Sequence, residues 1–233
     1  MIRAVLFDLD GTLLDIELDT FLSSYFSALG PVLASVTGLP QRTALAALSQ
    51  ATDAMMRPHA GVTNRDVFNQ AFETLTGTDL SLADHDSAVR EFYDTEFPRL
   101  KGTHGPRRGA DAAVAAARSA GMHLALATNP IFPRAAILER LRWTGIDAAE
   151  FDVVTTYEVA EACKPLPAYF LSVAAALGTD PAECLMVGDD PNLDMRAADT
   201  GMKTFYVGAS DAVDADWQGS LLDLSDVLAR LPG

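Results

Sequence analysis

The first twelve residues constrain the fold of this chain more than any other stretch. Residues 2–7 are almost all apolar, which is the pattern of a strand buried on both faces of a parallel sheet. The run ends in Asp8-Leu9-Asp10-Gly11-Thr12, so two carboxylates leave the strand together, and Gly11 allows a sharp turn behind them. Because open α/β sheets bind ligands beyond the carboxyl ends of their strands, this pair predicts a site for a cation or a substrate.

A plainer role for the two acids is also possible. Aspartate often caps helices or closes turns, and most Asp-x-Asp pairs in proteins do no more than that. The position of Asp8 and Asp10, directly after an apolar strand, favours a functional site instead.

The charge balance excludes several classes of partner. The chain has 17 Lys and Arg against 32 Asp and Glu, a net charge of −15. Such a charge repels nucleic acid and anionic membranes, and a small phosphorylated substrate would need a divalent cation and local positive groups. Cys163 and Cys184 form no close-spaced pair, which is typical of a reducing compartment. The apolar start is too short for a signal peptide or a membrane span, so we expect a soluble, cytoplasmic protein. We expect it to be a monomer or a homodimer.

Residues 16–100 differ in pattern from the rest of the chain. Apolar side chains recur three or four positions apart and predict about four helices without a strand. We expect breaks between them at glycine and proline, namely at Gly30-Pro31, Gly38-Leu39-Pro40, residues 57–61 and Gly77-Thr78.

From residue 105 onward the pattern alternates between helix and strand. It predicts helices at residues 110–120, 133–143, 165–177, 192–200 and 220–231, and strands at residues 122–127, 151–155, 184–187 and 203–207. We expect residues 211–216, which are acidic, to form a surface loop. Alternation of this kind predicts a Rossmann-like, doubly wound α/β fold, with a parallel sheet covered by helices on both faces.

Four polar clusters follow the predicted strands or begin the predicted helices. They are Asp8-x-Asp10-Gly11-Thr12, Thr128-Asn129, Lys164-Pro165, and Gly188-Asp189-Asp190 with Asp194. In this order, and with a helical insertion after the first of them, they resemble the four motifs of the haloacid dehalogenase superfamily. The insertion resembles the helical (C1-type) cap of that family. The resemblance implies an α/β hydrolase core of residues 1–15 and 101–233 and a cap domain of residues 16–100.

The resemblance and the chemistry of the residues predict the same roles. Asp8 would be the nucleophile and form an aspartyl phosphate, and Asp10 would be the general acid and base. Mg²⁺ would be held by Asp8, the main-chain carbonyl of Asp10 and Asp189. Thr128, Asn129 and Lys164 would bind the phosphoryl oxygens, with main-chain N–H groups of Leu9, Gly11 and Thr128 as further donors. The supporting residues of the predicted site are Gly11, Thr12, Asp190 and Asp194.

Several assignments stay open at the level of sequence. Either Asp189 or Asp190 could be the direct metal ligand, with Asp189 favoured. Asp190 and Asp194 could contact the metal through water or orient Lys164. Thr128 and Asn129 could simply cap the next helix, and Lys164 and Asp194 could be surface residues.

Asp10 decides between the reactions known in the resembling family. Members that dehalogenate 2-haloacids generally lack an acid there, because a halide leaves without a proton. We therefore expect a Mg²⁺-dependent phosphatase acting on a small phosphorylated metabolite. The alternatives are a phosphomutase, a 2-haloacid dehalogenase, and a non-enzymatic regulator that binds a phosphorylated ligand. Candidate cap residues that select the substrate are Arg57, His59, Asn64 and Arg65, and each could equally be an exposed loop residue.

Overall fold

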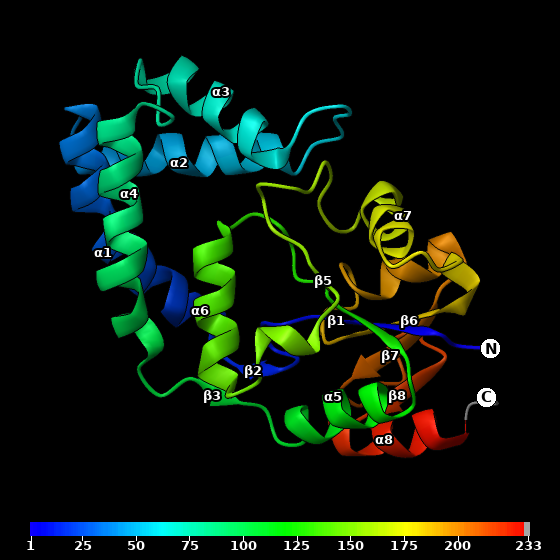
Figure 1. The fold of residues 1–233 in the computed structure, drawn as a ribbon. Coiled ribbons are helices and arrows are strands. Elements are labelled where there is room, and N and C mark those ends of the chain that lie inside the picture. The colour runs from blue at the N-terminus through cyan, green and yellow to red at the C-terminus, as the bar shows by residue number, and fades with distance from the viewer. Residues whose placement is uncertain (231–233) are drawn as a thin grey trace.

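A parallel sheet of six strands, in the order β5-β4-β1-β6-β7-β8, forms the centre of the α/β part of the molecule (Figure 1). The computed structural model describes residues 1–230. The strands are β1 (Ala4–Phe7), β4 (His123–Leu126), β5 (Val153–Val154), β6 (Cys184–Gly188), β7 (Lys203–Val207) and β8 (Trp217–Gly219). A short antiparallel ribbon, β2 (Leu14–Asp15) with β3 (Gly105–Pro106), lies beside the sheet.

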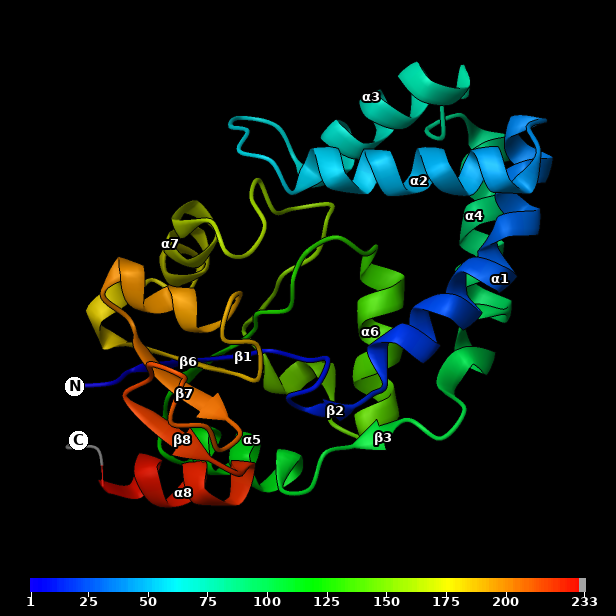
Figure 2. The same cartoon turned by 180° about the vertical axis from the view of Figure 1, so that it is seen from behind.

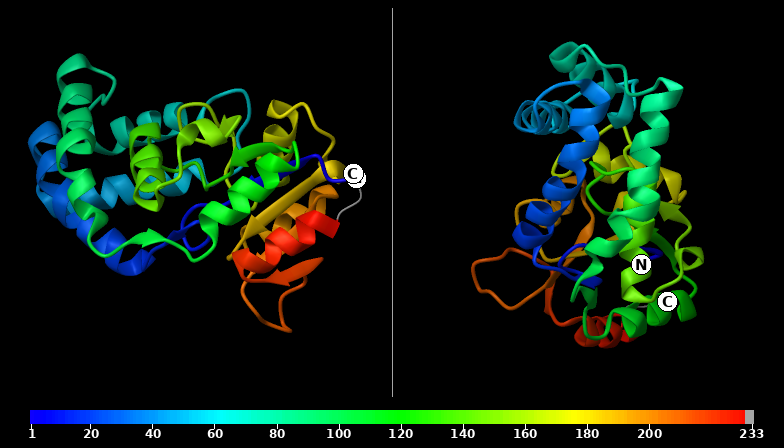
Figure 3. Two further views of the ribbon diagram at one scale, coloured as in Figure 1. Left: turned by 60° about the horizontal axis from the view of Figure 1, so that its bottom comes forward. Right: turned by 90° about the vertical axis from the view of Figure 1, so that its left-hand side faces the viewer.

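Strand β1 lies in the interior of the sheet between β4 and β6, and its side chains alternate between two cores. Val5 and Phe7 join the larger core, whereas Ala4 and Leu6 join the smaller one. Helix α7 (Pro167–Ala176) packs on the Ala4 face, and α5 (Ala110–Ser119) and α8 (Leu221–Arg230) pack side by side on the Val5 face (Figure 3). The predicted doubly wound α/β fold is therefore confirmed.

Four helices between β2 and β3 form a group that stands away from the sheet, on the side of α6 (Arg134–Thr144) (Figures 1 and 2). They are α1 (Leu18–Thr37), α2 (Gln41–Met55), α3 (Asn64–Thr76) and α4 (Ala83–Thr95), and the 3₁₀ helix η1 (Phe97–Lys101) leads back to β3. Aromatic side chains fill the space between them and α6, including Phe21, which contacts both Phe97 and Trp143 edge to face. The predicted number of helices is confirmed.

The expected break at Gly30-Pro31 is wrong, because α1 continues through both residues. Tyr25, Leu29 and Leu33 are buried along this helix, and their packing compensates for the backbone hydrogen bond that proline cannot donate. At Gly30 the two helices come close: a Cβ atom there would lie 2.3 Å from the exposed Gln41 side chain of α2, which would have to move.

Several elements of the second half of the chain differ from the prediction. Strand β5 is Val153–Val154 instead of residues 151–155, and α7 begins at Pro167 instead of residue 165. The helix expected at residues 192–200 is shorter, a 3₁₀ helix η4 (Met195–Thr200), because the Asp190 carboxylate first accepts the N–H groups of Asn192 and Leu193 in a turn. Strand β8 adds an edge that was not predicted. Helix α8 begins at Leu221, and residue 231, the last of the predicted helix, lies outside the described residues.

Within residues 1–230, no single helix has the length and apolar character needed to cross a membrane. Helices α1 and α2 meet those criteria only together, and they are bent by 100° relative to each other.

Candidate active site

Three of the four polar clusters meet at the carboxyl edge of the sheet. Asp8 follows β1, Thr128 and Asn129 follow β4, and Asp189 follows β6. Because β4, β1 and β6 are parallel neighbours, their carboxyl ends lie side by side. The remaining cluster, the third in sequence, reaches this edge through Lys164 from the loop before α7.

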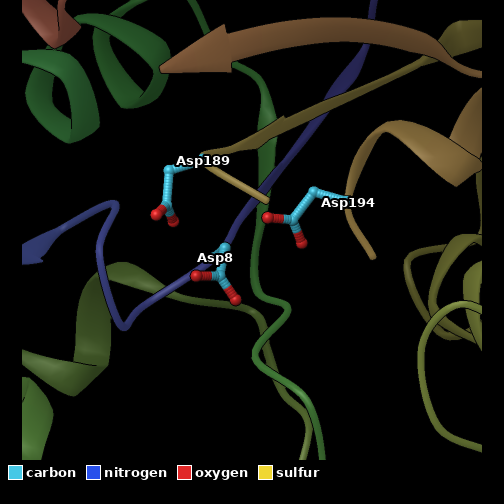
Figure 4. A group of neighbouring side chains, drawn as sticks. All are labelled: Asp8, Asp189 and Asp194. Atoms are coloured by element: carbon cyan, nitrogen blue, oxygen red, sulfur yellow. The ribbon is translucent and has the colours of Figure 1, made fainter. Parts of the chain in front are cut away.

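The carboxylates of Asp8, Asp189 and Asp194 form a compact group. One oxygen of each lies within 4.8 Å of the others, and the three side chains turn toward a common space (Figure 4). Hard divalent cations prefer such an all-oxygen donor set. These residues therefore fit a divalent metal ion, and Asp190 lies outside the group, in the turn that precedes η4.

Lys164 links two of these carboxylates. Its Nζ donates to Asp8 Oδ1 at 2.8 Å and to Asp194 Oδ1 at 2.6 Å, and the side chain is buried. Burial lowers the pKa of Lys164, but the carboxylates of Asp194 and Asp8 raise it by more, so the net shift is upward. The lysine is therefore a fixed positive charge beside Asp8 and not a surface residue.

Two of the carboxylates have pKa values above their usual range. Burial raises the pKa of Asp8 well above that range, against the opposing effect of Lys164, and Asp194 raises it further. Burial also raises the pKa of Asp189, although the hydroxyl of Thr12 donates to it at 2.9 Å and lowers it. Both shifts arise mainly from burial, with the neighbouring Asp194 carboxylate as a smaller cause, and a bound cation would oppose both effects.

Two glycines allow the carboxylates to come this close to the backbone. At Gly11, where φ is +85°, a Cβ atom would lie 2.3 Å from Asp189 Oδ2. At Gly188, a Cβ atom would lie 2.2 Å from Asp194 Oδ2. Any side chain at either position would therefore displace an acid of the group.

The loop after β4 is fixed by hydrogen bonds to the segments around it. Asn129 Oδ1 accepts the main-chain N–H of Lys164 at 3.1 Å. The carbonyl of Thr128 accepts the hydroxyls of Thr155 at 2.7 Å and Tyr169 at 2.9 Å. These contacts join the second cluster to the third, although the two are distant in sequence.

Two arginines contact the site and escaped the sequence analysis. Arg140 of α6 is fully buried and forms an ion pair with Asp10 Oδ2, and Arg107 donates to the carbonyl of Gly11. The sequence did contain a sign that Arg140 is buried: it lies four positions after Ala136 and three after Ile137, on the apolar face of its helix. Arg107 follows β3 in a loop and had none.

The candidate cap residues occupy different environments. Asn64 is buried, and its Nδ2 donates to the carbonyl of Pro130 at 2.9 Å. His59 is partly exposed and hydrogen-bonds Asn64 Oδ1 through Nε2 at 2.9 Å. Arg57 and Arg65 are exposed; Arg65 lines a cavity of about 500 Å³ between the four helices and residues 131–133, and Arg57 does not. Neither arginine has a contact with Asp8 or Asp10 among the hydrogen bonds and ion pairs of the described residues.

Comparison with known proteins gives relatives along nearly the whole chain. YhcW of Bacillus subtilis strain 168, named as a candidate phosphatase, is 30% identical over 210 residues, which are 89% of this chain and 84% of YhcW. N-acetylmuramic acid 6-phosphate phosphatase of Pseudomonas aeruginosa is 28% identical over 98% of this chain and 96% of its own length.

The fold also occurs in solved structures. A phosphatase from Thermococcus onnurineus superposes with a TM-score of 0.62 at 24% identity, covering 97% of this chain and 98% of the other. The family model of haloacid dehalogenase-like hydrolases matches residues 2–199. This match includes all four polar clusters and the four inserted helices, and with the relatives above it shows that the chain is an enzyme of the haloacid dehalogenase-like hydrolase family.

Proposed function

We propose that this enzyme is a Mg²⁺-dependent phosphatase that hydrolyses a phosphomonoester of a small metabolite, with Asp8 as the nucleophile. The observation that carries the proposal is the pairing of Asp8 with Lys164 inside a group of three carboxylates, with Asp10 two residues further along. A buried carboxylate held beside an ammonium group and next to a second acid is an arrangement that is common at catalytic sites.

The donor set supports Mg²⁺ as the cofactor. Asp8, Asp189 and Asp194 offer oxygen ligands only, and a main-chain carbonyl at Asp10 could complete the protein's share. When bound, Mg²⁺ would neutralise charge between the Asp8 carboxylate and the anionic phosphate. In this assignment Asp189 is a direct ligand, and Asp190 shapes the turn that carries Asp194.

The reaction follows in two steps from the roles of the two acids. In the first, an Asp8 oxygen forms a bond to phosphorus, the bond from phosphorus to the ester oxygen breaks, and Asp10 protonates the departing alcohol. In the second, Asp10 takes a proton from water, the water oxygen attacks phosphorus, and inorganic phosphate leaves Asp8. Lys164, Thr128 and Asn129 would stabilise the phosphoryl oxygens during both steps.

The substrate is proposed only as a class. The relatives include an enzyme named for N-acetylmuramic acid 6-phosphate. The net charge of −15 argues against a polyanionic partner. We propose that residues 16–100 act as a cap over the core of residues 1–15 and 101–233. The region between them, which includes Asn64 and Arg65, would then select the leaving group.

The test is hydrolysis of p-nitrophenyl phosphate with Mg²⁺, with EDTA, and by Asp8→Asn. We expect activity that requires the metal and falls by at least about 10³-fold in the variant, because the nucleophile is lost. Asp199→Asn, an exposed acid of η4, is the matched control and should retain full activity. Activity that survives in Asp8→Asn would overturn the proposal, and halide release from a 2-haloacid without phosphate release would replace it with dehalogenation.

A further inference from the structure

Arg140 is the most unusual charged residue of the described chain, because its side chain is wholly shielded from water. Its guanidinium lies 4.3 Å from the centre of the Phe132 ring and 5.7 Å from that of Phe21. Its Nε donates to the carbonyl of Ala136 one turn earlier. Such an environment fixes the guanidinium in place, since an arginine is costly to bury unless its surroundings hold and pair it.

Among the residues that the structure describes, the charge of Arg140 is paired with one acid, Asp10. Nη1 of Arg140 contacts Oδ2 of Asp10, and this is the ion pair between α6 and the turn after β1. An arginine can donate hydrogen bonds to both oxygens of a carboxylate, which is the strongest arrangement. Here it does not: Nη2 of Arg140 and Oδ1 of Asp10 are both buried and have no partner among the described residues.

An unpaired buried oxygen calls for a physical reason, because such a group loses its hydrogen bonds to water and gains none in return. A contact of Arg140 with Oδ2 alone fixes the orientation of the carboxylate and leaves Oδ1 without a donor, so the carboxyl group can still carry a proton.

We propose that Arg140 is the positioning residue of the general acid: it holds Asp10 by Oδ2 in one orientation, so that this acid can give its proton to the departing oxygen of the ester. The inference rests on the phosphatase function proposed above. Arg140 does not touch the phosphoryl group in this scheme, and its effect on the reaction passes through Asp10.

The proposal predicts a dependence on the leaving group that a purely structural role would not produce. A p-nitrophenolate ion leaves without a proton, whereas a less acidic phenol needs one from Asp10. Loss of the correct orientation of Asp10 should therefore slow the first step for esters of weakly acidic phenols and spare that step for p-nitrophenyl phosphate, whereas the second step is the same for every ester. A general weakening of the fold would slow all the esters alike.

The experiment compares p-nitrophenyl, phenyl and p-methoxyphenyl phosphate, which differ little in size, in wild type and Arg140→Met. We expect kcat/KM, which reports phosphoryl transfer to Asp8 with departure of the phenol, to fall by about tenfold or more for p-methoxyphenyl phosphate and by about threefold or less for p-nitrophenyl phosphate, since general acid catalysis is what is lost. Arg140→Lys, which keeps the charge, should lie between wild type and Arg140→Met. Arg142→Met, an exposed arginine of the same helix, is the control and should leave all three rates unchanged.

The outcomes separate this inference from the proposed function. Equal losses on all three esters, or no loss on any, would overturn the positioning role while leaving the phosphatase intact. A wild type that hydrolyses none of the esters would overturn the phosphatase, and the positioning role with it. If Arg140→Met does not fold, Arg140→Gln, whose amide is easier to accommodate beside Asp10, should show the same steeper dependence on the leaving group.

Discussion

At the scale of single residues, the site depends on how closely acids approach one another and the backbone. Asp8, Asp189 and Asp194 share one nearby ammonium group, that of Lys164, which contacts the first and the last of them. The two glycines at positions 11 and 188 provide the space for this crowding. Adding one methyl group at either glycine should therefore lower the catalytic activity as well as the stability of the protein.

Gly11→Ala tests this point. The new Cβ atom would meet the Asp189 carboxylate at 2.3 Å and would require a positive φ, so we expect phosphatase activity to fall by about 10²-fold or more with a loss of Mg²⁺ affinity. The readouts are hydrolysis of p-nitrophenyl phosphate and Mg²⁺ titration by calorimetry. Gly77→Ala is the matched control, because its φ is +71° but a Cβ atom there meets nothing within 4 Å. It should lose about 1 kcal/mol of stability and keep its activity. Equal activity losses in the two variants would contradict our explanation.

The residues of the site were predictable because each stands at a recognisable place. Asp8, Thr128 and Asp189 directly follow apolar strands, and topology alone then brings them to one edge. Arg140 is different, since arginine on a helix is usually exposed and the partner that makes its burial tolerable is 130 positions away. The sequence shows which face of α6 Arg140 occupies, but it does not show that Asp10 lies against that face and pairs with it.

At the scale of secondary-structure elements, hydrogen bonds and ion pairs of single side chains join neighbouring helices and strands. Asp152, just before β5, accepts the main-chain N–H of Leu124 in β4 at 2.8 Å and forms an ion pair with Arg118 of α5 at 3.1 Å. Partial burial raises the pKa of Asp152, but the Leu124 N–H and Arg118 lower it by more, so the net shift is downward. One carboxylate thus joins two strands and a helix.

Asp152→Asn should weaken the protein in a pH-dependent way. A carboxyl whose pKa is lowered by folding stabilises the folded state above its unfolded pKa of about 3.9, and this contribution disappears as the pH falls through the folded pKa. We expect the urea midpoint of the variant to lie below that of wild type at pH 7 and the gap to close toward about pH 3. Asp211→Asn, in an exposed loop, should show no gap at pH 7. A gap that persists unchanged at low pH would show that the ionised carboxylate is not the cause.

Element boundaries were harder to predict than the elements themselves. The pattern of apolar residues gives β7 at residues 203–207 as observed, because a buried strand has a strong signal. It fails at Pro31, where tertiary packing outweighs the local preference against proline, and at residues 192–194, where an Asp190 turn replaces the first helical turn. Strand β8 is three residues long and has few apolar residues, so its pairing with β7 decides its structure.

At the scale of the whole molecule, the start of α3 connects the inserted helices to the loops of the candidate site. The main-chain N–H groups of Asn64 and Arg65 donate to the carbonyls of Ala160 at 2.7 Å and Tyr157 at 2.8 Å. The Asn64 amide also reaches Pro130 and Cys163, which adjoin Asn129 and Lys164. The proposed cap is thus tied, through one buried side chain, to the loops of the second and third clusters.

Asn64→Ala should loosen this connection. Acceptors in both loops would lose a buried donor, and we expect a loss of about 1–3 kcal/mol in the free energy of unfolding. Hydrogen exchange measured by mass spectrometry should accelerate at residues 64–66 and 160–164. Gln70→Ala, on the exposed side of the same helix, is the control and should change neither quantity. Unchanged exchange in Asn64→Ala would mean that the helices are held to the loops by other contacts.

The place of β1 in the sheet also has a consequence for how the protein is made. Ala4 pairs with His123 on one side and Cys184 on the other, so β1 leaves the ribosome long before either of its neighbours. The four inserted helices emerge in the interval and bury many of their apolar residues against one another through local contacts. Until β6 is released, Asp8 is attached to an apolar segment that lacks one of its partner strands and that other chains could capture. The carboxylates of Asp8 and Asp189 can therefore meet only late in synthesis, when β1 and β6 have paired.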